Sequence, residues 1–330
     1  MNMRQFSRRW WQAVRSPARG TPTVLVLACL AAGAIEIGSS GEPSRSVVAA
    51  EKEAAATPAG AKKMLVSPAE LQAWLKDADT RVVDVRPQAA YESGHIPGAV
   101  RVDGAAWEEK SSTADGLRDR GFWATAIGGR GLGRDTRVVL YGANVAATAR
   151  VWWLLKYCGL RDVALLDGGW EAWRQAGGAI ATDLSEPKAV SFVPEFQVDR
   201  LAERPLVQAG LKNAHQRLWD ARSAGEYTGQ QVIGSRPGRI PGAVHLDWQN
   251  LLDETGRFRP ARDLERLLAD KGITREAPVV TYCYSGGRAS VAAFVAELLG
   301  YPKVKNYYGS WREWSACTDL PAQTQKSPGK

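Results

Sequence analysis

The sequence is organised around one stretch, Pro278-Val-Val-Thr-Tyr-Cys-Tyr-Ser-Gly-Gly-Arg-Ala-Ser290, which has Cys283 at its centre. A run of apolar, β-branched residues ends at Tyr282, which indicates a buried strand. From Val291 onward the apolar residues recur at spacings of three and four, which predicts a helix that ends near Gly300. We therefore expect Cys283 in a short turn between a strand and the first turn of a helix.

The residues after Cys283 are suited to holding a sulfur anion. A free thiol has a pKa of roughly 8.5 and is mostly un-ionised at neutral pH, but helix N–H groups and a nearby arginine favour the thiolate. Two glycines allow the backbone to turn its N–H groups inward. A buried structural cysteine is the alternative, but it would need neither the glycines nor the arginine. We predict that Cys283 is the nucleophile and that the substrate is bound by Tyr284, Ser285, Gly286, Gly287 and Arg288.

Length and charge are those of a globular protein of two ordinary domains. The chain has 330 residues, of which 45% are hydrophobic and 24% charged. Its net charge of +8 is partly local, because residues 1–20 contain five arginines and no acid, which leaves +3 for the rest. The charge therefore gives no reason to expect a nucleic-acid partner.

The N-terminus has the pattern of a targeting segment. The basic start precedes an apolar run at residues 24–35, and small residues lead to Val48-Ala49-Ala50. We predict that residues 1–50 are a cleaved export signal and that the protein is exported, to the periplasm. The alternatives are a retained membrane anchor at residues 24–35, a lipoprotein signal ending at Cys29, and export by a twin-arginine route. Residues 51–63 are expected to be a flexible spacer.

Cysteine and histidine usage favours neither disulfides nor a metal site. Of the four cysteines, Cys29 lies in the leader, Cys158 is on the apolar side of a predicted helix, and Cys317 has no local signal. The three histidines are widely separated, and no Cys-x-x-Cys pair occurs. We therefore expect no metal, and we predict structural roles for His95, His215 and His245.

The sequence contains an internal duplication. Asp84, Arg86 and Tyr91 match residues 136 positions later, and Ile96-Pro-Gly-Ala99 matches Ile240-Pro-Gly-Ala243. An offset of 141 relates Tyr141, Gly159 and Gly168 to Tyr282, Gly300 and Gly309, and it relates two tryptophans, Trp170 and Trp173, to Trp311 and Trp314. The same offset places Gly142 opposite Cys283 and Ala147 opposite Arg288, so we expect one active site, in the second copy.

Strands and helices alternate in each half, which predicts a parallel α/β sheet covered by helices on both faces. Ser67-Pro-Ala-Glu70 is a capping box that opens a helix, Glu70–Leu75. Strands are expected near 81–85, 137–141 and 163–166, and a helix through 147–158. The predicted domains are residues 64–183, non-catalytic, and 199–330, catalytic, joined by a linker at 184–198 that carries two prolines.

Together these motifs resemble the tandem-domain rhodanese family, the thiosulfate and 3-mercaptopyruvate sulfurtransferases. The likeness covers about residues 64–320 and includes the Asp-x-Arg and Ile-Pro-Gly-Ala segments, the Cys283–Arg288 loop and the Gly-x-Trp-x-x-Trp ends of both halves. It implies two tandem rhodanese-like domains. It also implies that the Cys283 thiolate takes the outer sulfur of thiosulfate as a persulfide and passes it to cyanide or a thiol, without any cofactor.

Departures from the family pattern bear on the substrate. The loop is Cys-Tyr-Ser-Gly-Gly-Arg, so Ser285 stands where animal-type thiosulfate enzymes have a lysine, and Glu226 stands where the family has a substrate-binding arginine. The loss of both cations weakens the mercaptopyruvate assignment more than the thiosulfate one. A non-enzymatic persulfide carrier that serves a thiol protein is the alternative. A phosphatase is disfavoured because of the spacing between the cysteine and the arginine of its phosphate-binding loop. That loop needs one more residue than this one has, so its arginine would stand at the position of Ala289.

Four residues outside the loop are supporting candidates. Asp220 and Arg222 could form an ion pair that orders the loop or could contact the substrate, and the structural role is favoured because the inactive half keeps the same pair. Arg239 is a candidate for the pocket rim, with a solvated arginine as the alternative. Trp248 is a candidate for the pocket wall, although a core role is the favoured interpretation. The recurring tryptophans are predicted to pack in the core or between domains.

Overall fold

The computed structural model describes residues 63–184, 186–212 and 216–325, all of which belong to one compact unit, Thr57–Lys330. The predicted export signal, nearly all of the predicted spacer and His215 lie outside the described residues. No helix within the described ranges is long and apolar enough to cross a membrane. The anchor at residues 24–35 stays a prediction.

The first domain is a five-stranded parallel sheet with the order β1-β5-β4-β2-β3. Its strands are β1 (Leu65–Val66), β2 (Thr80–Asp84), β3 (Val100–Arg101), β4 (Arg137–Tyr141) and β5 (Asp162–Leu166). One face is covered by α1 (Pro68–Trp74), α2 (Gln88–Glu92) and α6 (Gly169–Gln175). The other is covered by α3 (Gly104–Ser111), α4 (Arg120–Gly128) and α5 (Val145–Tyr157), with a short 3-10 helix η1 (Gly116–Arg118).

The second domain repeats this architecture with the order β6-β10-β9-β7-β8, again all parallel. Its strands are β6 (Leu201–Ala202), β7 (Arg217–Asp220), β8 (Val244–His245), β9 (Val279–Tyr282) and β10 (Val304–Tyr307). One face carries α7 (Arg204–Gly210), α8 (Ala224–Thr228) and α11 (Ser310–Ala316). The other carries α9 (Ala261–Ala269), α10 (Gly287–Leu298) and η3 (Trp248–Leu251), and η2 (Val198–Arg200) precedes β6. The predicted fold class is confirmed.

Local sequence signals account for several boundaries. The Ser67 hydroxyl accepts from the Glu70 N–H at 3.3 Å, and the Glu70 carboxylate accepts from the Ser67 N–H at 2.9 Å, so the predicted capping box opens α1. The expected strands correspond to β2, β4 and β5, and the expected helix to α5. β9 and α10 flank the turn that carries Cys283, as predicted.

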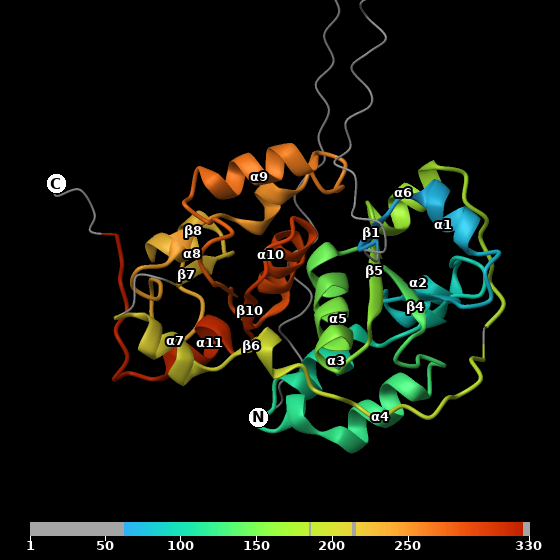
Figure 1. Ribbon diagram of the computed structural model, residues 1–330, viewed down its shortest axis with the longest axis horizontal. Helices are drawn as coiled ribbons and strands as arrows, with labels where there is room; N and C mark the ends of the chain where they lie inside the picture. The colour runs from blue at the N-terminus through green and yellow to red at the C-terminus, as the bar shows by residue number, and fades with distance from the viewer. Residues whose placement is uncertain (1–62, 185, 213–215, 326–330) are drawn as a thin grey trace, which may run out of the picture. The chain divides into compact units, whose positions relative to one another are not determined.

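A single hydrophobic core runs through both domains, where α5 packs against α10 (Figure 1). Trp152 of α5 meets Phe294 of α10 edge to face, with the ring centroids 5.0 Å apart. Cys158 is fully buried in this core, as predicted. Each sheet has a second core on its outer face, and the recurring tryptophans Trp173 and Trp314 lie there rather than between the domains.

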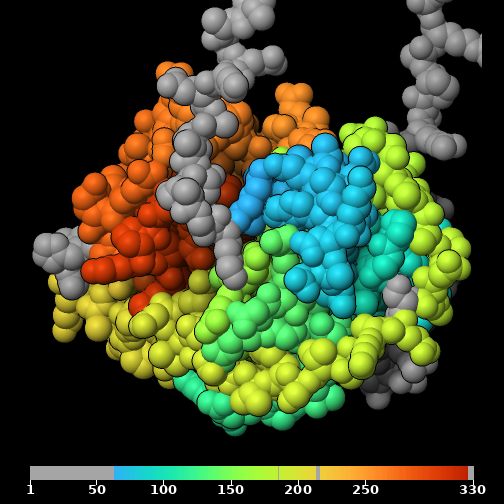
Figure 2. All heavy atoms as spheres, turned by 45° about the vertical axis from the view of Figure 1, so that its right-hand side comes forward, coloured from blue at the N-terminus to red at the C-terminus, as the bar shows by residue number. Residues whose placement is uncertain are grey.

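The described residues of the segment between the domains form no helix or strand before η2, yet several of them are hydrogen-bonded to the first domain. Val190 donates its N–H to the Gly128 carbonyl of α4 at 3.0 Å, and Gln197 donates to Tyr157 of α5 at 2.8 Å. Phe192 is buried in the shared core. This segment therefore lies along the surface of the first domain, where Figure 2 shows it in yellow over the green elements.

Each domain contains a buried Asp–Arg pair at the carboxyl end of one strand, because Asp84 is the last residue of β2 and Asp220 is the last residue of β7. Asp220 accepts from Arg222 Nη2 at 2.6 Å and from the Tyr282 hydroxyl at 2.6 Å, and Arg222 also donates to the carbonyl of Gly238. Asp84, Arg86 and Tyr141 repeat this network in the first domain. Each guanidinium also lies over a tryptophan ring, Trp311 or Trp170. The pairs brace the chain in both copies.

We predict that Asp84→Asn and Asp220→Asn each lower the free energy of unfolding by about 3–5 kcal/mol, because each leaves a buried arginine charge uncompensated. Denaturant unfolding measures the effect. Asp135→Asn is the matched control, since Asp135 and Arg161 form a solvent-exposed pair worth under about 1 kcal/mol. Losses equal to that of the control would show that the buried pairs do not brace the fold.

Candidate active site

Cys283 follows the last residue of β9 and is almost completely buried, with 1% of its surface exposed. Its N–H donates to the Ser310 hydroxyl at 3.1 Å, and its carbonyl accepts from the Trp311 N–H at 3.0 Å. The Ser310 hydroxyl donates to the Tyr307 carbonyl at 2.7 Å and lies 4.0 Å from the Cys283 sulfur. The start of α11 thus fixes the backbone that carries the thiol.

Ser310 adopts an uncommon backbone conformation, with a φ of 54°. Residues other than glycine and asparagine seldom occupy this left-handed region. The equivalent position in the first domain is Gly169, whose φ is 57°. The copy that has the cysteine therefore places a serine where the other copy has a glycine.

The loop after Cys283 turns sharply into α10. Gly286 has a φ of 88°, and a Cβ there would come within 2.8 Å of the Tyr308 ring, so both conformation and space require glycine. The Gly286 carbonyl accepts from the Ser290 N–H at 2.9 Å. The backbone N–H groups of residues 284–288 have no acceptor among the residues that the structure describes. These donors are available to an anion beside Cys283.

Arg288, the predicted cation of the loop, forms an ion pair with Glu226. Its Nη1 and Nη2 donate to the two carboxylate oxygens of Glu226 at 2.6 and 2.8 Å. Burial opposes ionisation of Glu226, but the bonds and charge of Arg288 outweigh it and hold the pKa of Glu226 below its usual range. The positive charge of Arg288 is therefore compensated by a neighbouring residue.

Arg150 was not among the site residues predicted from the sequence, and it reaches the catalytic loop from α5 of the first domain. Its Nη1 donates to the Ser285 carbonyl at 2.6 Å and to the Tyr308 hydroxyl at 3.0 Å. Its Nη2 donates to a Glu108 carboxylate oxygen at 2.7 Å, and only 6% of the residue is exposed. Burial opposes its charge, but Tyr308 and Glu108 offset that effect and raise the pKa of Arg150. A charged group of the first domain therefore holds the loop of the second.

The position of Arg150 also explains why residue 287, the second glycine of the loop, has no side chain. A Cβ on Gly287 would lie 2.7 Å from Arg150 Nη2, closer than real side chains approach, so the guanidinium occupies the space that a side chain would need. The signal in the sequence was an arginine within the apolar helix predicted at 147–158. Its partner could not be inferred from that position.

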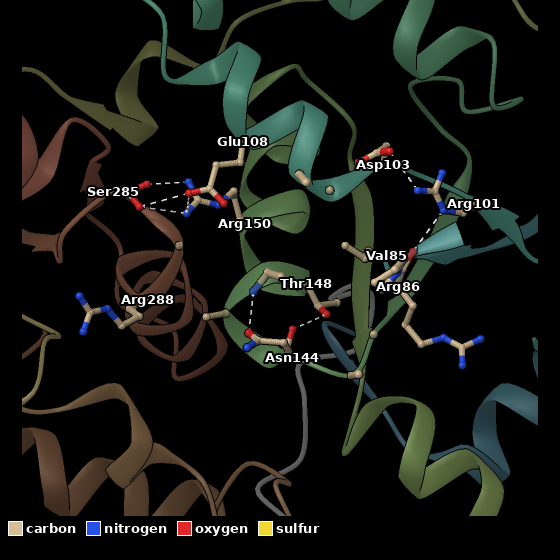
Figure 3. A pocket seen from close by; sticks show the side chains of 18 of the residues that line it. Val85, Arg86, Arg101, Asp103, Glu108, Asn144, Thr148, Arg150, Ser285 and Arg288 are labelled. Carbon is tan, nitrogen blue, oxygen red and sulfur yellow. Dashed lines mark hydrogen bonds and ion pairs between the residues drawn. The ribbon is translucent and has the colours of Figure 1, made fainter. Parts of the chain in front are cut away.

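A cavity of about 710 Å³ lies between the loop and the first domain. The second domain lines it with Cys283, Tyr284, Ser285, Gly287 and Arg288. The first domain lines it with the ends of β2, β3 and β4 and with the start of α5, including Arg101, Asp103, Gly142 and Asn144. Figure 3 shows Arg101 and Asp103 on the opposite side of the cavity from Ser285 and Arg288. The candidate site therefore belongs to both domains.

The supporting candidates lie outside this lining. Arg239 donates to the Tyr227 carbonyl at 3.2 Å, and its guanidinium lies 4.2 Å from the centre of the Tyr227 ring rather than at the cavity rim. Trp248 is partly buried and packs against the shared core, which is the role that the sequence favoured over the pocket wall. Asp220 and Arg222 are buried behind the loop. In the parts of the chain that the structure describes, no group of three or more His, Cys, Asp or Glu residues could hold a metal ion.

Comparison with known proteins identifies the architecture. A family model described as a rhodanese-like domain matches twice, at residues 67–176 and 204–317. The chain belongs to the rhodanese family. Its two rhodanese-like domains are the two sheets described above.

Relatives within the rhodanese family are similar over nearly their full length. The chain is 32% identical over 262 residues to a thiosulfate sulfurtransferase of Azotobacter vinelandii, covering 79% of this chain and 97% of the relative. It is 31% identical over 262 residues to a thiosulfate sulfurtransferase of Pseudomonas aeruginosa, with the same coverage. It is 35% identical over 277 residues to the sulfur carrier protein TtuD of Thermus thermophilus, covering 78% and 96%. The function class that these likenesses support is sulfurtransferase.

Solved structures are similar as well. The anaerobic ergothioneine biosynthesis enzyme from Chlorobium limicola, in complex with trimethyl histidine, matches with a TM-score of 0.71 and 27% identity. The match covers 79% of this chain and 70% of that one. A cysteine-persulfide form of EanB with ergothioneine matches equally well. The rhodanese fold of the chain is therefore seen in a protein whose cysteine has been observed as a persulfide.

We predict that Gly287→Ala slows alkylation of Cys283 about ten-fold, because the new methyl displaces Arg150 from the loop. In an Arg150→Ala background the same substitution should change the rate little, since the obstructing guanidinium is gone. Iodoacetamide labelling, located by mass spectrometry, measures the rates. Gly133→Ala is the control, because a Cβ there meets the Thr136 hydroxyl at an ordinary 3.5 Å. Equal effects of Gly287→Ala in both backgrounds would contradict the coupling.

Proposed function

We propose that this rhodanese transfers the outer sulfur of thiosulfate to a thiophilic acceptor through a persulfide on Cys283. The observation that carries the proposal is a buried thiol followed by a run of unpartnered backbone N–H groups, at the edge of a cavity between the domains. This arrangement suits an anionic sulfur nucleophile and an anionic substrate. The names of the relatives from Azotobacter vinelandii and Pseudomonas aeruginosa support the choice of donor.

In the first step the Cys283 thiolate attacks the outer sulfur of thiosulfate. A bond forms between the two sulfurs, the S–S bond of thiosulfate breaks, and sulfite leaves with the electron pair. The products are a Cys283 persulfide anion and sulfite, so charge is conserved. The N–H groups of residues 284–288 would hold first the oxyanion and then the persulfide charge.

In the second step an acceptor nucleophile attacks the outer sulfur of the persulfide. Cyanide becomes thiocyanate, or a thiolate becomes a persulfide, and the Cys283 thiolate is regenerated. Donor and acceptor then follow each other in the site, which is ping-pong kinetics. The chemistry uses the sulfur atoms and hydrogen-bond donors of the chain and requires no cofactor.

Thiosulfate is favoured over 3-mercaptopyruvate as the donor. A mercaptopyruvate whose sulfur is at Cys283 needs a cation for its carboxylate beside the loop, and there Arg288 is already paired with Glu226, while Arg150 is paired with Glu108. Thiosulfate can instead use backbone N–H groups that have no other acceptor among the described residues.

We expect Cys283→Ser to abolish thiocyanate formation from thiosulfate and cyanide, because a serine hydroxyl cannot carry a sulfane sulfur. The assay uses leaderless protein, and intact-mass spectrometry after thiosulfate treatment should find one added sulfur atom on wild-type protein only. Cys317→Ser is the control, since Cys317 lies outside the cavity. Full activity of the Cys283 variant would overturn the proposal.

A persulfide carrier is the second candidate, favoured by the 35% identity to the sulfur carrier protein TtuD. A carrier would load sulfur at the same Cys283 and deliver it to a thiol protein. The same experiment separates the two functions, because a carrier gains the sulfur atom rapidly but turns over little with cyanide or small thiols.

We also propose that the protein is exported, from the basic and apolar pattern of residues 1–50. N-terminal sequencing of the protein from its source cells should then find a mature chain that begins just after Ala50. A chain that retains residues 24–35 would point instead to a membrane anchor.

A further inference from the structure

The wall of the cavity opposite Cys283 is the place where the first domain would have its own active site. It is formed by the carboxyl ends of β2, β3 and β4, which is where open α/β sheets bind ligands. Gly142 stands in the place of the cysteine, and a Cβ there would overlap the Thr148 hydroxyl. The first domain has therefore lost a nucleophile but still offers a ligand-binding edge to the cavity of the second.

The size of the cavity exceeds the needs of the proposed donor. Sites of roughly 300–1,000 Å³ hold organic molecules, and this cavity measures about 710 Å³. Thiosulfate and cyanide each consist of a handful of atoms, which the loop beside Cys283 can hold alone. In ping-pong kinetics sulfite leaves before the acceptor enters, so the remaining space is free for a larger acceptor.

The wall of the cavity opposite Cys283 contains a positive and a negative side chain, Arg101 and Asp103, which form an ion pair. Arg101 Nη2 lies 3.0 Å from an Asp103 carboxylate oxygen, and the Nε of Arg101 donates to the Arg86 carbonyl at 3.2 Å. These bonds fix the guanidinium and leave its Nη1 without an acceptor among the described residues. The side chains of Arg101 and Asp103 are 19% and 48% exposed. A ligand in the cavity can therefore reach both charges.

Asp103 stays ionised in this setting. It is the N-cap of α3, and its carboxylate accepts from the Ala106 N–H at 3.0 Å. That hydrogen bond and the one from Arg101 hold the pKa of Asp103 below its usual range. The wall thus carries a fixed cation and a fixed anion side by side.

We infer that the Arg101–Asp103 pair is the acceptor subsite, and that it selects a zwitterionic, amino-acid-type thiol. The carboxylate of the acceptor binds Arg101, and its ammonium group binds Asp103. Its thiol then points across the cavity toward the wall that Cys283 lines. This inference rests on the proposed persulfide chemistry and names the acceptor class for it.

The transfer step balances without any further reactant. The acceptor thiolate attacks the outer sulfur of the Cys283 persulfide, forming a new S–S bond. The S–S bond to Cys283 breaks, and the electron pair stays on the Cys283 sulfur. The acceptor leaves as a persulfide, and the thiolate of Cys283 is restored.

The test compares four small thiols as acceptors under saturating thiosulfate: L-cysteine, cysteamine, 3-mercaptopropionate and 2-mercaptoethanol. Sulfite release gives KM and kcat for each. Arg101→Gln should raise the KM of L-cysteine and of 3-mercaptopropionate about five-fold, the loss expected for one ion pair, with kcat and the 2-mercaptoethanol KM unchanged. Asp103→Asn should raise the KM of L-cysteine and of cysteamine similarly, and asparagine keeps the helix cap.

Arg161→Gln is the matched control, because Arg161 forms an exposed pair with Asp135 outside the cavity. Its KM values should equal those of wild type. Sulfite release in a single turnover, before acceptor is added, tests the loading of Cys283 separately. Normal loading with unchanged KM values in both cavity variants would overturn the subsite. Absence of loading in wild-type protein would instead overturn the proposed function.

Discussion

The active loop of this protein depends on a buried guanidinium that comes from the other domain. Arg150 is desolvated, and a buried arginine is stable only if its donors find acceptors. Two of those acceptors belong to the second domain, Ser285 and Tyr308, and one to the first, Glu108. The burial of Arg150 therefore uses acceptors from both domains, and its hydrogen bonds join the loop to the first domain.

This contact between the domains explains why the first domain persists without a nucleophile. It supplies α5, which shares a core with α10, and the strand edge that closes the cavity. The buried Asp–Arg pairs were kept in both copies because they brace the fold of each. The thiol was needed only once, and Gly142 marks the copy that does without it.

Much of this architecture could be predicted from sequence, because its signals are local. The capping box at Ser67, the strand before Cys283 and the helix after it each depend on residues within a few positions of one another. The duplication extended those predictions to a second copy. The family resemblance then supplied the function, which comparison with known proteins supports as sulfurtransferase.

Contacts between distant segments could not be predicted in the same way. Glu226 and Arg288 are 62 positions apart, and Arg150 and Ser285 are 135 apart, so no periodicity relates them. The sequence showed that Glu226 stands where the family has an arginine, but only the folded structure shows that Glu226 pairs with Arg288. Arg239 was a candidate for the pocket rim because it stands in the place of His95, but its guanidinium lies over the Tyr227 ring. Trp248 packs against the core, which is the role that the sequence favoured.

At equivalent positions with nearly the same backbone conformation, one copy has a serine and the other has a glycine. Gly169 adopts a φ near 57° at little cost, whereas Ser310 at 54° pays a strain of roughly 1–3 kcal/mol. The hydroxyl returns that energy through its bonds to the Cys283 N–H and the Tyr307 carbonyl. A Cβ on Gly169 would come within 2.4 Å of the Gly142 carbonyl oxygen, so the first copy has no room for a side chain at this position. The same backbone turn is therefore closed by glycine where no thiol follows the strand, and held by a serine hydroxyl where one does.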